Sequence, residues 1–351
     1  MEPMELALLL AKKANPYPNP RVGAVIVKGK EIIGSGYHRK AGTPHAEVEA
    51  ILDAEKNGAD VKGATLYVSL EPCSHHSKRT PPCTELIIEK KISKVVYGMS
   101  DPNPLVSSRK VLQKAGIIVK GPVAEEKGRA MNKRYLENIS KKPFVAIKMA
   151  MSADGKSATK TGDSKWISCA KSREFVARLR ADYDAVMVGA RTVIKDNPRL
   201  TARIPGAKNP IRVIVDGKLK IPLNSKVVQN GTIIVITKQA SLKKINAIKA
   251  AGADVFVCGE DRIDLKALIR SLSAMGIKKI LIEGGSELNA GAVEAGIVDK
   301  FYIFVAPKII GGVDAPGIIG GSGINDMKKA RKVRGMKAKM IGADILIEFK
   351  V

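Results

Sequence analysis

The sequence predicts an α/β protein of two domains, and three observations carry this prediction. The chain has 351 residues, which exceeds the usual size of a single domain. Apolar segments of strand length alternate with amphipathic helical segments in both halves, as in layered α/β folds. Between the halves, residues 140–143 are polar and end in proline, which is typical of a linker. We therefore expect domains at residues 1–140 and 144–351.

The first half begins with a helix and a hairpin. Apolar residues at helical spacing predict the helix at 4–14, and a proline-rich loop follows it. Strands at 22–27 and 31–37 flank a Lys-Gly-Lys turn, which makes them a hairpin. Beyond it we expect helices at 45–58, 81–90, 107–115 and 124–138, and strands at 65–69, 94–98 and 117–120.

The second half repeats the alternation of strands and helices without repeating the sequence of the first. We expect helices at 170–180, 242–250, 265–275 and 286–295. The expected strands lie at 144–149, 185–188, 211–215, 232–237, 254–257, 279–283, 300–306 and 345–349. A glycine-rich stretch at 311–323 is interpreted as a long loop.

Composition limits the classes of protein to consider. The chain is 45% apolar, which is enough for sizeable cores, and none of its apolar runs approaches the length of a membrane span. The N-terminal residues lack the pattern of a signal peptide. We therefore expect a cytoplasmic protein with no membrane partner.

The net charge of +26 is distributed unevenly along the chain. Residues 1–140 hold 22 basic and 15 acidic side chains, and the rest of the chain holds 38 and 19. A basic half favours nucleic acid or phosphate-bearing small ligands. One Trp, seven Tyr and six Phe do not cluster with the basic residues, so a stacking platform for nucleic acid is poorly supported. Part of the charge is equally well explained as a lysine-rich solvated surface.

Two of the four cysteines, Cys73 and Cys83, lie in one short segment beside two histidines. A disulfide framework is not expected in a cytosolic chain of this size, so this segment favours a metal ion. Cys169 and Cys258 lie far from the segment and from each other, and they are best interpreted as reduced, packed thiols.

His45, Cys73 and Cys83 offer one imidazole and two thiolates, which are ligands that zinc accepts. Three protein ligands leave the fourth tetrahedral position open, as in catalytic zinc sites. Glu47 lies two residues past His45 and can face that position without being a ligand. His-x-Glu followed by Pro-Cys-x-x-Cys is the signature of zinc nucleobase deaminases, although nine residues separate the cysteines here.

This ligand set predicts hydrolytic removal of an amino group from a purine or pyrimidine. Zinc lowers the pKa of a bound water to roughly 7, and Glu47 can move its proton to the ring nitrogen and to the departing ammonia. Two other interpretations stay open. One is a structural zinc site with His75 or His76 as the fourth ligand, which leaves Glu47 without a role. The other is a cluster that binds no metal.

The first 140 residues resemble the deaminase domain of the bifunctional deaminase/reductase family of riboflavin biosynthesis. The similarity lies at residues 18–23, 36–38, 41–42, 45–47, 70–76, 80–83 and 101–104. It implies a cytidine-deaminase-like α/β/α fold, and it explains the wide spacing of the cysteines, which separates this family from the C-x-x-C deaminases. The chain departs from the family at residues 77–79, where it is one residue longer and serine replaces glycine.

The resemblance also implies which residues bind the deaminase substrate: Asn19, His38, Asp101, Asn103, and either Lys78 or Arg79. Short polar side chains on proline-flanked loops give fixed hydrogen bonds to a planar ring and its ribose phosphate. Taken singly, each has a simpler explanation, because Asn-Pro and Asp-Pro pairs form ordinary turns and a loop histidine is often satisfied locally.

One feature of the second half suits phosphate binding. The expected strand at 279–283 leads into Gly284, Gly285 and a helix, so that backbone N–H groups can approach an anion closely. The pattern is not G-x-G-x-x-G, so a Rossmann dinucleotide fold is not indicated. A lone Gly-Gly pair is most often a turn.

Residues 144–351 resemble the reductase domain of the same family, which has a dihydrofolate-reductase-like fold and uses NADPH. The similarity lies at residues 149–156, 164–167, 189–193, 196–201, 283–285 and 306–308. The resemblance thus covers nearly the whole chain in the family's domain order. It implies zinc and NADPH as cofactors and a small phosphoribosyl-pyrimidine as substrate, with no nucleic-acid partner, and we expect a homo-oligomer.

Carried over by position, the resemblance implies NADPH contacts from Ala150, Trp166, Thr192, Asp196, Gly217, Gly285, Ser286, Glu287 and Leu288. It implies substrate contacts from Ser164, Arg180, Leu200, Arg203 and Glu283. Guanidinium groups grip a phosphate in bidentate fashion, which suits the two arginines. The family often has serine at the position of Gly217. Glycine lacks the serine hydroxyl, so only a backbone contact with NADPH is expected there. A solvated helix face and plain core packing are the simpler explanations for Arg180 and Trp166.

Together these patterns predict an enzyme with two activities. It would deaminate 2,5-diamino-6-(5-phosphoribosylamino)pyrimidin-4(3H)-one and then reduce the ribosyl chain with NADPH to give 5-amino-6-(5-phosphoribitylamino)uracil. One alternative is a deaminase of RNA bases whose basic half binds RNA, but the low aromatic content and the reductase-like motifs argue against it. Another is a zinc-stabilised RNA-binding protein without catalysis.

Overall fold

The computed structural model describes the chain at residues 1–74, 81–103 and 106–351. The chain divides into two compact units, Met1–Lys141 with Arg270–Gly276, and Lys142–Ile269 with Ile277–Val351. Each unit has its own sheet and its own hydrophobic core. None of the helices in the described ranges combines the length and apolar character that a membrane crossing requires.

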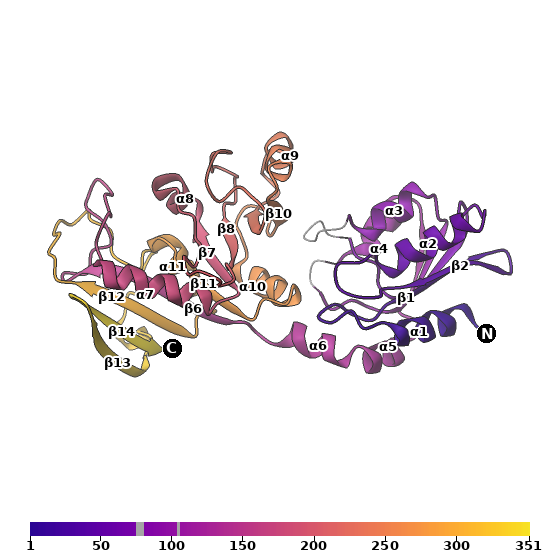
Figure 1. The fold of residues 1–351 in the computed structure, drawn as a ribbon, viewed down its shortest axis with the longest axis horizontal. Coiled ribbons are helices and arrows are strands. Elements are labelled where there is room, and N and C mark those ends of the chain that lie inside the picture. The colour runs from indigo at the N-terminus through magenta and orange to yellow at the C-terminus, as the bar shows by residue number, and fades with distance from the viewer. Residues whose placement is uncertain (75–80, 104–105) are drawn as a thin grey trace. The chain divides into compact units, whose positions relative to one another are not determined.

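The first unit is built on a five-stranded sheet in the order β2-β1-β3-β4-β5 (Figure 1). Its strands are β1 (Gly23–Lys28), β2 (Glu31–Tyr37), β3 (Thr65–Leu70), β4 (Lys94–Met99) and β5 (Ile118–Lys120). Its helices are α1 (Pro3–Lys13), α2 (Ala46–Lys56), α3 (Cys83–Glu89), α4 (Ser108–Lys114), α5 (Glu125–Met131) and α6 (Lys133–Ser140). With α2, α3 and α4 on one face of the sheet and α1 and α5 on the other, the unit is an α/β/α sandwich.

Glycines in β2 let α2 lie directly on the hairpin. A Cβ on Gly34 would lie 2.4 Å from the carbonyl oxygen of Ala50, and one on Gly36 would lie 2.6 Å from the amide nitrogen of Ala50. The small side chains Ala46, Ala50 and Ala54 complete this contact and are fully buried. This close approach fixes the amino end of α2, which carries His45 and Glu47.

The second unit is built on a nine-stranded sheet in the order β10-β9-β8-β7-β11-β6-β12-β14-β13. The strands are β6 (Phe144–Ser152), β7 (Ala185–Gly189), β8 (Ile211–Val215), β9 (Thr232–Ile236), β10 (Asp254–Val257), β11 (Lys279–Ile282), β12 (Lys300–Ala306), β13 (Arg334–Ile341) and β14 (Asp344–Lys350). The helices that follow the linker are α7 (Ala170–Ala181), α8 (Ala190–Asp196), α9 (Leu242–Ala250), α10 (Leu265–Ala274) and α11 (Ser286–Glu294).

The seven strands from β10 to β12 run parallel, and β14 and β13 add an antiparallel edge. Because the carboxyl ends of parallel strands meet at one edge of a sheet, the segments that follow β6, β7 and β11 converge there. That edge therefore brings together residues that are more than a hundred positions apart in the sequence.

The observed architecture confirms the predicted α/β fold class, with one correction in the first half and two in the second. The helix expected at 124–138 is in fact two helices that meet at Asn132. The Asn132 side chain is buried and bonds both backbone groups of Arg21, accepting from its N–H at 2.8 Å and donating to its carbonyl at 3.1 Å. In the second half, α8 and β13 were not expected. Residues 334–340 of β13 are all exposed, so this strand lacks the apolar pattern that sequence reasoning detects.

Candidate active sites of the two units

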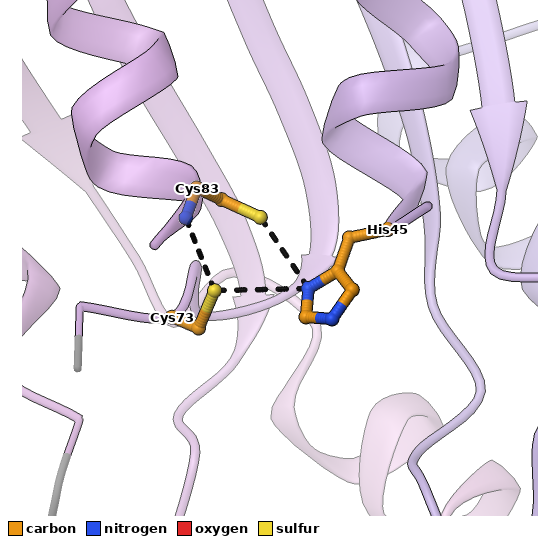
Figure 2. A group of neighbouring side chains, drawn as sticks. All are labelled: His45, Cys73 and Cys83. Carbon is orange, nitrogen blue, oxygen red and sulfur yellow. Dashed lines mark hydrogen bonds between the residues drawn. The ribbon is translucent and has the colours of Figure 1, made fainter. Parts of the chain in front are cut away.

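Figure 2 shows the side chains of His45, Cys73 and Cys83 converging from three segments of the first unit. His45 is the N-cap residue of α2, Cys83 is the first residue of α3, and Cys73 follows β3. Their ligand atoms all lie within 4.8 Å of one another. His45 Nδ1 is 3.7 Å from Cys73 Sγ and 3.4 Å from Cys83 Sγ.

These separations fit a tetrahedral zinc ion. Zn–S bonds of about 2.3 Å and Zn–N bonds of about 2.0 Å place the nitrogen and sulfur ligands roughly 3.6 Å apart at tetrahedral angles. The backbone N–H of Cys83 donates to Cys73 Sγ at 3.2 Å, which favours the thiolate that zinc requires. His75 and His76, the alternative fourth ligands, lie outside the described residues, as do Lys78 and Arg79.

Glu47 lies beside this cluster. It is the second residue of α2, it is only 3% exposed, and it lines the same cavity of about 50 Å³ as His45 and Cys73. His38, Glu71 and Asp101 complete the polar part of the lining. The small cavity therefore places the Glu47 carboxylate next to the ligand cluster. A general acid–base group must lie this close to the atoms between which it transfers protons.

His38 has a defined tautomer. Its Nδ1 lies 3.0 Å from the carbonyl oxygen of Pro44, which can only accept, so Nδ1 carries the proton. Its Nε2 then accepts from the side-chain amide of Asn19 at 3.1 Å. The His38 ring lies 5.1 Å from that of His45, centroid to centroid. Asn19 and His38 are thus joined to each other and to the residue that precedes the zinc ligand.

Asp101 is held by two donors. Its Oδ1 accepts from the backbone N–H of Asn103 and from the hydroxyl of Tyr135, both at 2.9 Å. Burial raises the pKa of Asp101 to about 6, helped by the negative charges of Glu71 and Cys73 and opposed by these two hydrogen bonds. Asp101 faces the cavity, whereas Asn103 supports it through the backbone.

A far larger cavity of about 890 Å³ lies in the second unit. Most of the residues that sequence reasoning expects at the reductase site line it: Ala150, Ser164, Trp166, Arg180, Thr192, Asp196, Leu200, Arg203, Glu283, Gly285 and Ser286. Three expected residues do not. Glu287 is exposed and forms an ion pair with Arg191. The side chain of Leu288 lies against Gly284. The carbonyl of Gly217 accepts a hydrogen bond from the hydroxyl of Thr237.

Arg180 and Glu283 form a buried bidentate ion pair in this cavity. Arg180 Nε donates to Glu283 Oε1 at 2.5 Å and Nη2 donates to Oε2 at 2.8 Å, and the two side chains are 13% and 10% exposed. Burial raises the pKa of Glu283, but the charge of Arg180 outweighs it and holds that pKa below its ordinary value. Arg180 Nη1 also donates to the carbonyl of Thr201 at 3.1 Å.

The residues of this cavity fit a nicotinamide dinucleotide. The volume is in the range of cofactor sites. One buried lining atom, Asn289 Oδ1, lacks a hydrogen-bond partner in the described part of the chain, so a ribose hydroxyl can donate to it. A second, Asp196 Oδ1, lacks a hydrogen bond there and has the Lys165 ammonium 3.8 Å away. Gly285 is the N-cap of α11 and no side chain caps that end, so its backbone N–H groups suit a phosphate.

Lys148 also lines the cavity, and sequence reasoning did not single it out. It lies in the middle of β6, and its burial lowers the pKa of its amine, as does the charge of Arg180, while Glu283 raises it. The signal was present in the sequence, because Lys148 interrupts an otherwise apolar strand. A buried charge at such a position is costly in free energy unless an oppositely charged side chain or a ligand pairs with it.

Comparisons with known proteins agree with both sites. The family model of the RibD C-terminal domain matches residues 143–347, and that of the zinc-binding region of cytidine and deoxycytidylate deaminases matches residues 1–99. The riboflavin biosynthesis protein RibD of Actinobacillus pleuropneumoniae is 44% identical, with 99% of this chain and 94% of that protein covered. The one from Aquifex aeolicus is also 44% identical, with 99% and 97% covered.

Two solved structures extend the similarity to the fold of the whole chain. RibD of Acinetobacter baumannii, form 1, is 33% identical with a TM-score of 0.55, and 99% of this chain and 97% of that chain are covered. The deaminase/reductase of Thermotoga maritima is 36% identical with a TM-score of 0.51 and the same coverage.

The two folds and the two sites define a bifunctional enzyme, a zinc-dependent deaminase joined to an NADPH-dependent reductase. Full-length similarity to proteins of one kind narrows the class further. The chain belongs to the RibD family and acts in riboflavin biosynthesis. The predicted fold class, enzyme class and cofactors are thereby confirmed.

Proposed function

We propose that residues 1–140 deaminate 2,5-diamino-6-(5-phosphoribosylamino)pyrimidin-4(3H)-one and that residues 144–351 then reduce the ribosyl chain with NADPH. The product would be 5-amino-6-(5-phosphoribitylamino)uracil. The Thermotoga maritima relative is named for both activities, as a diaminohydroxyphosphoribosylaminopyrimidine deaminase and 5-amino-6-(5-phosphoribosylamino)uracil reductase. The observation that carries the proposal is the cluster of His45, Cys73 and Cys83 with Glu47 in the same cavity.

In the deaminase step, His45, Cys73 and Cys83 would hold a zinc ion, which would supply the Lewis acidity that activates water. Glu47 would take one proton of that water and deliver it to the ring nitrogen, and would then pass the remaining hydroxyl proton to the amino group, which leaves as ammonia while the carbonyl forms. Its burial at the start of α2 supports this role, because a shielded carboxylate exchanges protons with substrate rather than with bulk solvent.

The pyrimidine lies against the polar groups that line the same cavity. Asn19 and His38 are held in one orientation by their mutual hydrogen bond and by Pro44, so they bind the ring without first having to be ordered. Asp101 faces the cavity, and the backbone of Asn103 orients it. Lys78 or Arg79 binds the ribose phosphate.

In the reductase step, NADPH supplies the hydride when it is bound. Ala150, Trp166, Thr192 and Asp196 hold the cofactor together with the segment from Gly285 to Leu288, and Gly217 contributes through its backbone. Ser164, Leu200, Arg203 and the pair of Arg180 with Glu283 hold the substrate. This assignment is supported by position, because eleven of the fourteen residues line one cavity. The three that do not are Gly217, Glu287 and Leu288.

The enzyme acts in the cytoplasm as a homo-oligomer. The support for association is β13, which forms one edge of the nine-stranded sheet and exposes Met336 and Met340 at 61% and 62%. An exposed strand edge with apolar side chains pairs readily with another chain. Light scattering on the wild type and on Met340→Lys tests this, since a monomeric wild type would contradict it.

The direct test supplies the pyrimidine substrate to the zinc-loaded protein, first without and then with NADPH. Ammonia should be released in both reactions, and NADPH should be oxidised once deaminated product is present. A transfer RNA serves as the competing substrate. If NADPH stays unoxidised after deamination while the transfer RNA is deaminated, the chain is an RNA-base deaminase and the proposal is wrong.

A further inference from the structure

A second cavity in the second unit borders the reductase cavity, and none of the expected site residues lines it. It has a volume of about 560 Å³ and lies at the amino ends of β8 and β9, where Ile211 and Gly231 form part of its wall. Three basic residues line it, Arg199, Arg212 and Lys226, and no acidic residue is among the described residues that do. The uncharged polar residues Thr201, Asn209, Gln229 and Asn230 complete its polar lining.

Arg212 is the buried member of this group. It is 7% exposed, and strand alternation places it on the same face of the sheet as the fully buried Ile214. Its Nε donates to the hydroxyl of Thr232 at 2.8 Å, and its Nη2 donates to the carbonyl of Asn230 at 2.5 Å. These bonds fix the guanidinium at the end of the cavity but leave its charge uncompensated.

Nothing acidic in the described part of the chain neutralises Arg212. None of the ion pairs found there includes it, and burial alone lowers the pKa of its guanidinium. The carbonyl of Asp184 accepts from the N–H of Ile211, but the Asp184 carboxylate is committed to the amides of Lys278 and Lys279 at 2.8 and 2.9 Å. A buried charge without a counterion is costly, so an anion from outside the chain would stabilise this region.

The cavity shares one wall with the large reductase cavity. Arg199, Thr201 and Lys226 line both. Arg199 and Lys226 are exposed, so their side chains are free to turn toward a ligand in either space. The cavity of Arg212 is therefore a separate space next to the catalytic one, and a shared residue can respond to occupancy of both.

We propose that this cavity binds a phosphate group, with Arg212 as its buried anchor and Arg199 and Lys226 at its mouth. A tetrahedral anion with several acceptor oxygens suits three cations that approach from the loop after α8, from β8 and from the segment before β9. The phosphate is either a free anion or part of a ligand that reaches over from the shared wall. Binding itself does not depend on the proposed reductase activity.

Titration calorimetry with inorganic phosphate tests the site on the full-length zinc-loaded protein. Arg212→Gln should weaken binding by about tenfold or more, because a charge-assisted hydrogen bond contributes about 1.5–3 kcal/mol. Since Arg212 is buried, the double variant of Arg199→Gln with Lys226→Gln provides a second probe at exposed positions, and it should weaken binding several-fold. Lys249→Gln, which removes an exposed charge on α9, is the matched control and should bind as the wild type does.

A further titration in saturating NADPH separates the two sources of the phosphate. Unchanged affinity identifies a free anion as the occupant, and loss of binding identifies a phosphate of the cofactor. The proposal is overturned if the wild type binds no phosphate, or if both cavity variants bind it as tightly as Lys249→Gln does.

Discussion

The two active sites of this chain differ in size and in charge. The deaminase cavity of about 50 Å³ is lined by three carboxylates, Glu47, Glu71 and Asp101, beside the thiol ligand. The reductase cavity of about 890 Å³ is lined by many basic side chains, among them Lys148, Arg180 and Arg203. An acidic lining suits a bound cation, and a basic lining suits ligands that carry phosphates.

This difference indicates how each site distributes its function. In the small site, the proposed chemistry depends on three ligands and one carboxylate, so a single change there should abolish it. In the large site, binding is spread over segments that follow several parallel strands, so most single changes should weaken it by degrees. The exception is the ion pair of Arg180 and Glu283, because both charges are buried.

Loss of a zinc ligand should have the largest effect. Cys83→Ala removes one of the three ligands, so zinc content should fall and ammonia release should drop by at least about 10³-fold, because the metal supplies several kcal/mol of transition-state stabilisation. Metal analysis and an ammonia assay measure this. Cys258→Ala, which changes a buried cysteine of the second unit, is the control. Retention of zinc and activity in Cys83→Ala would remove this residue from the site.

Breaking the buried pair should come next. Glu283→Gln leaves the Arg180 guanidinium without its counterion and should destabilise the second unit by about 3–5 kcal/mol. Reduction of deaminated substrate should fall, and ammonia release should persist. Urea unfolding and the two separate assays measure these effects. An unchanged stability of the second unit would show that the pair is not buried in solution.

The same pair predicts a dependence of stability on pH. Because the pKa of Glu283 is lower in the folded state than in the unfolded chain, the pair stabilises the fold above the unfolded value of about 4.3 and less as the pH falls through the folded value. Glu283→Gln should therefore narrow the difference in unfolding free energy between pH 7 and pH 4. A difference as large as that of the wild type would contradict the lowered pKa.

A packing change behind the zinc site should have an intermediate effect. Gly34→Ala places a methyl group 2.4 Å from the carbonyl of Ala50, so α2 must shift, and with it His45 and Glu47. We expect a loss of about 1–3 kcal/mol in stability and a lower rate of deamination. Ser35→Ala, at the neighbouring position that strand alternation places on the other face of the sheet, is the control. Equal rates in the two variants would show that β2 does not position the site.

An exposed ion pair on the same helix as Arg180 should have the smallest effect. Arg178 pairs with Glu174 at 2.8 Å, and both side chains are more than 60% exposed. Arg178→Gln should change stability by less than about 1 kcal/mol and leave both activities intact. Chemical unfolding compares it directly with Glu283→Gln. Equal losses in the two variants would remove the distinction between buried and exposed pairs.

Sequence reasoning reached the zinc ligands and Glu47 from residue types and their order, whereas Asn19, His38, Asp101 and Asn103 came only through the resemblance. It reached the second site through the resemblance, because the reductase residues are scattered over more than 130 positions and share no local pattern. Lys148 was missed there, although a lysine inside an apolar strand is visible in the sequence.

Other features depend on contacts that no local pattern contains. The break between α5 and α6 arises from Asn132 bonding a loop 111 residues away. The tautomer of His38 depends on the carbonyl of Pro44. The charge of Arg212 is uncompensated because the fold directs the Asp184 carboxylate to other groups. These are properties of the tertiary structure, and they are also where the structure adds most to the account of function.

The central claim is that Glu47 moves the proton in a zinc-dependent deamination, and Glu47→Gln tests it most directly. Zinc content should match the wild type, ammonia release should fall by about 10²–10⁴-fold, and reduction of deaminated substrate should be unchanged. Wild-type ammonia release in this variant, or loss of its zinc, would contradict the role given to Glu47.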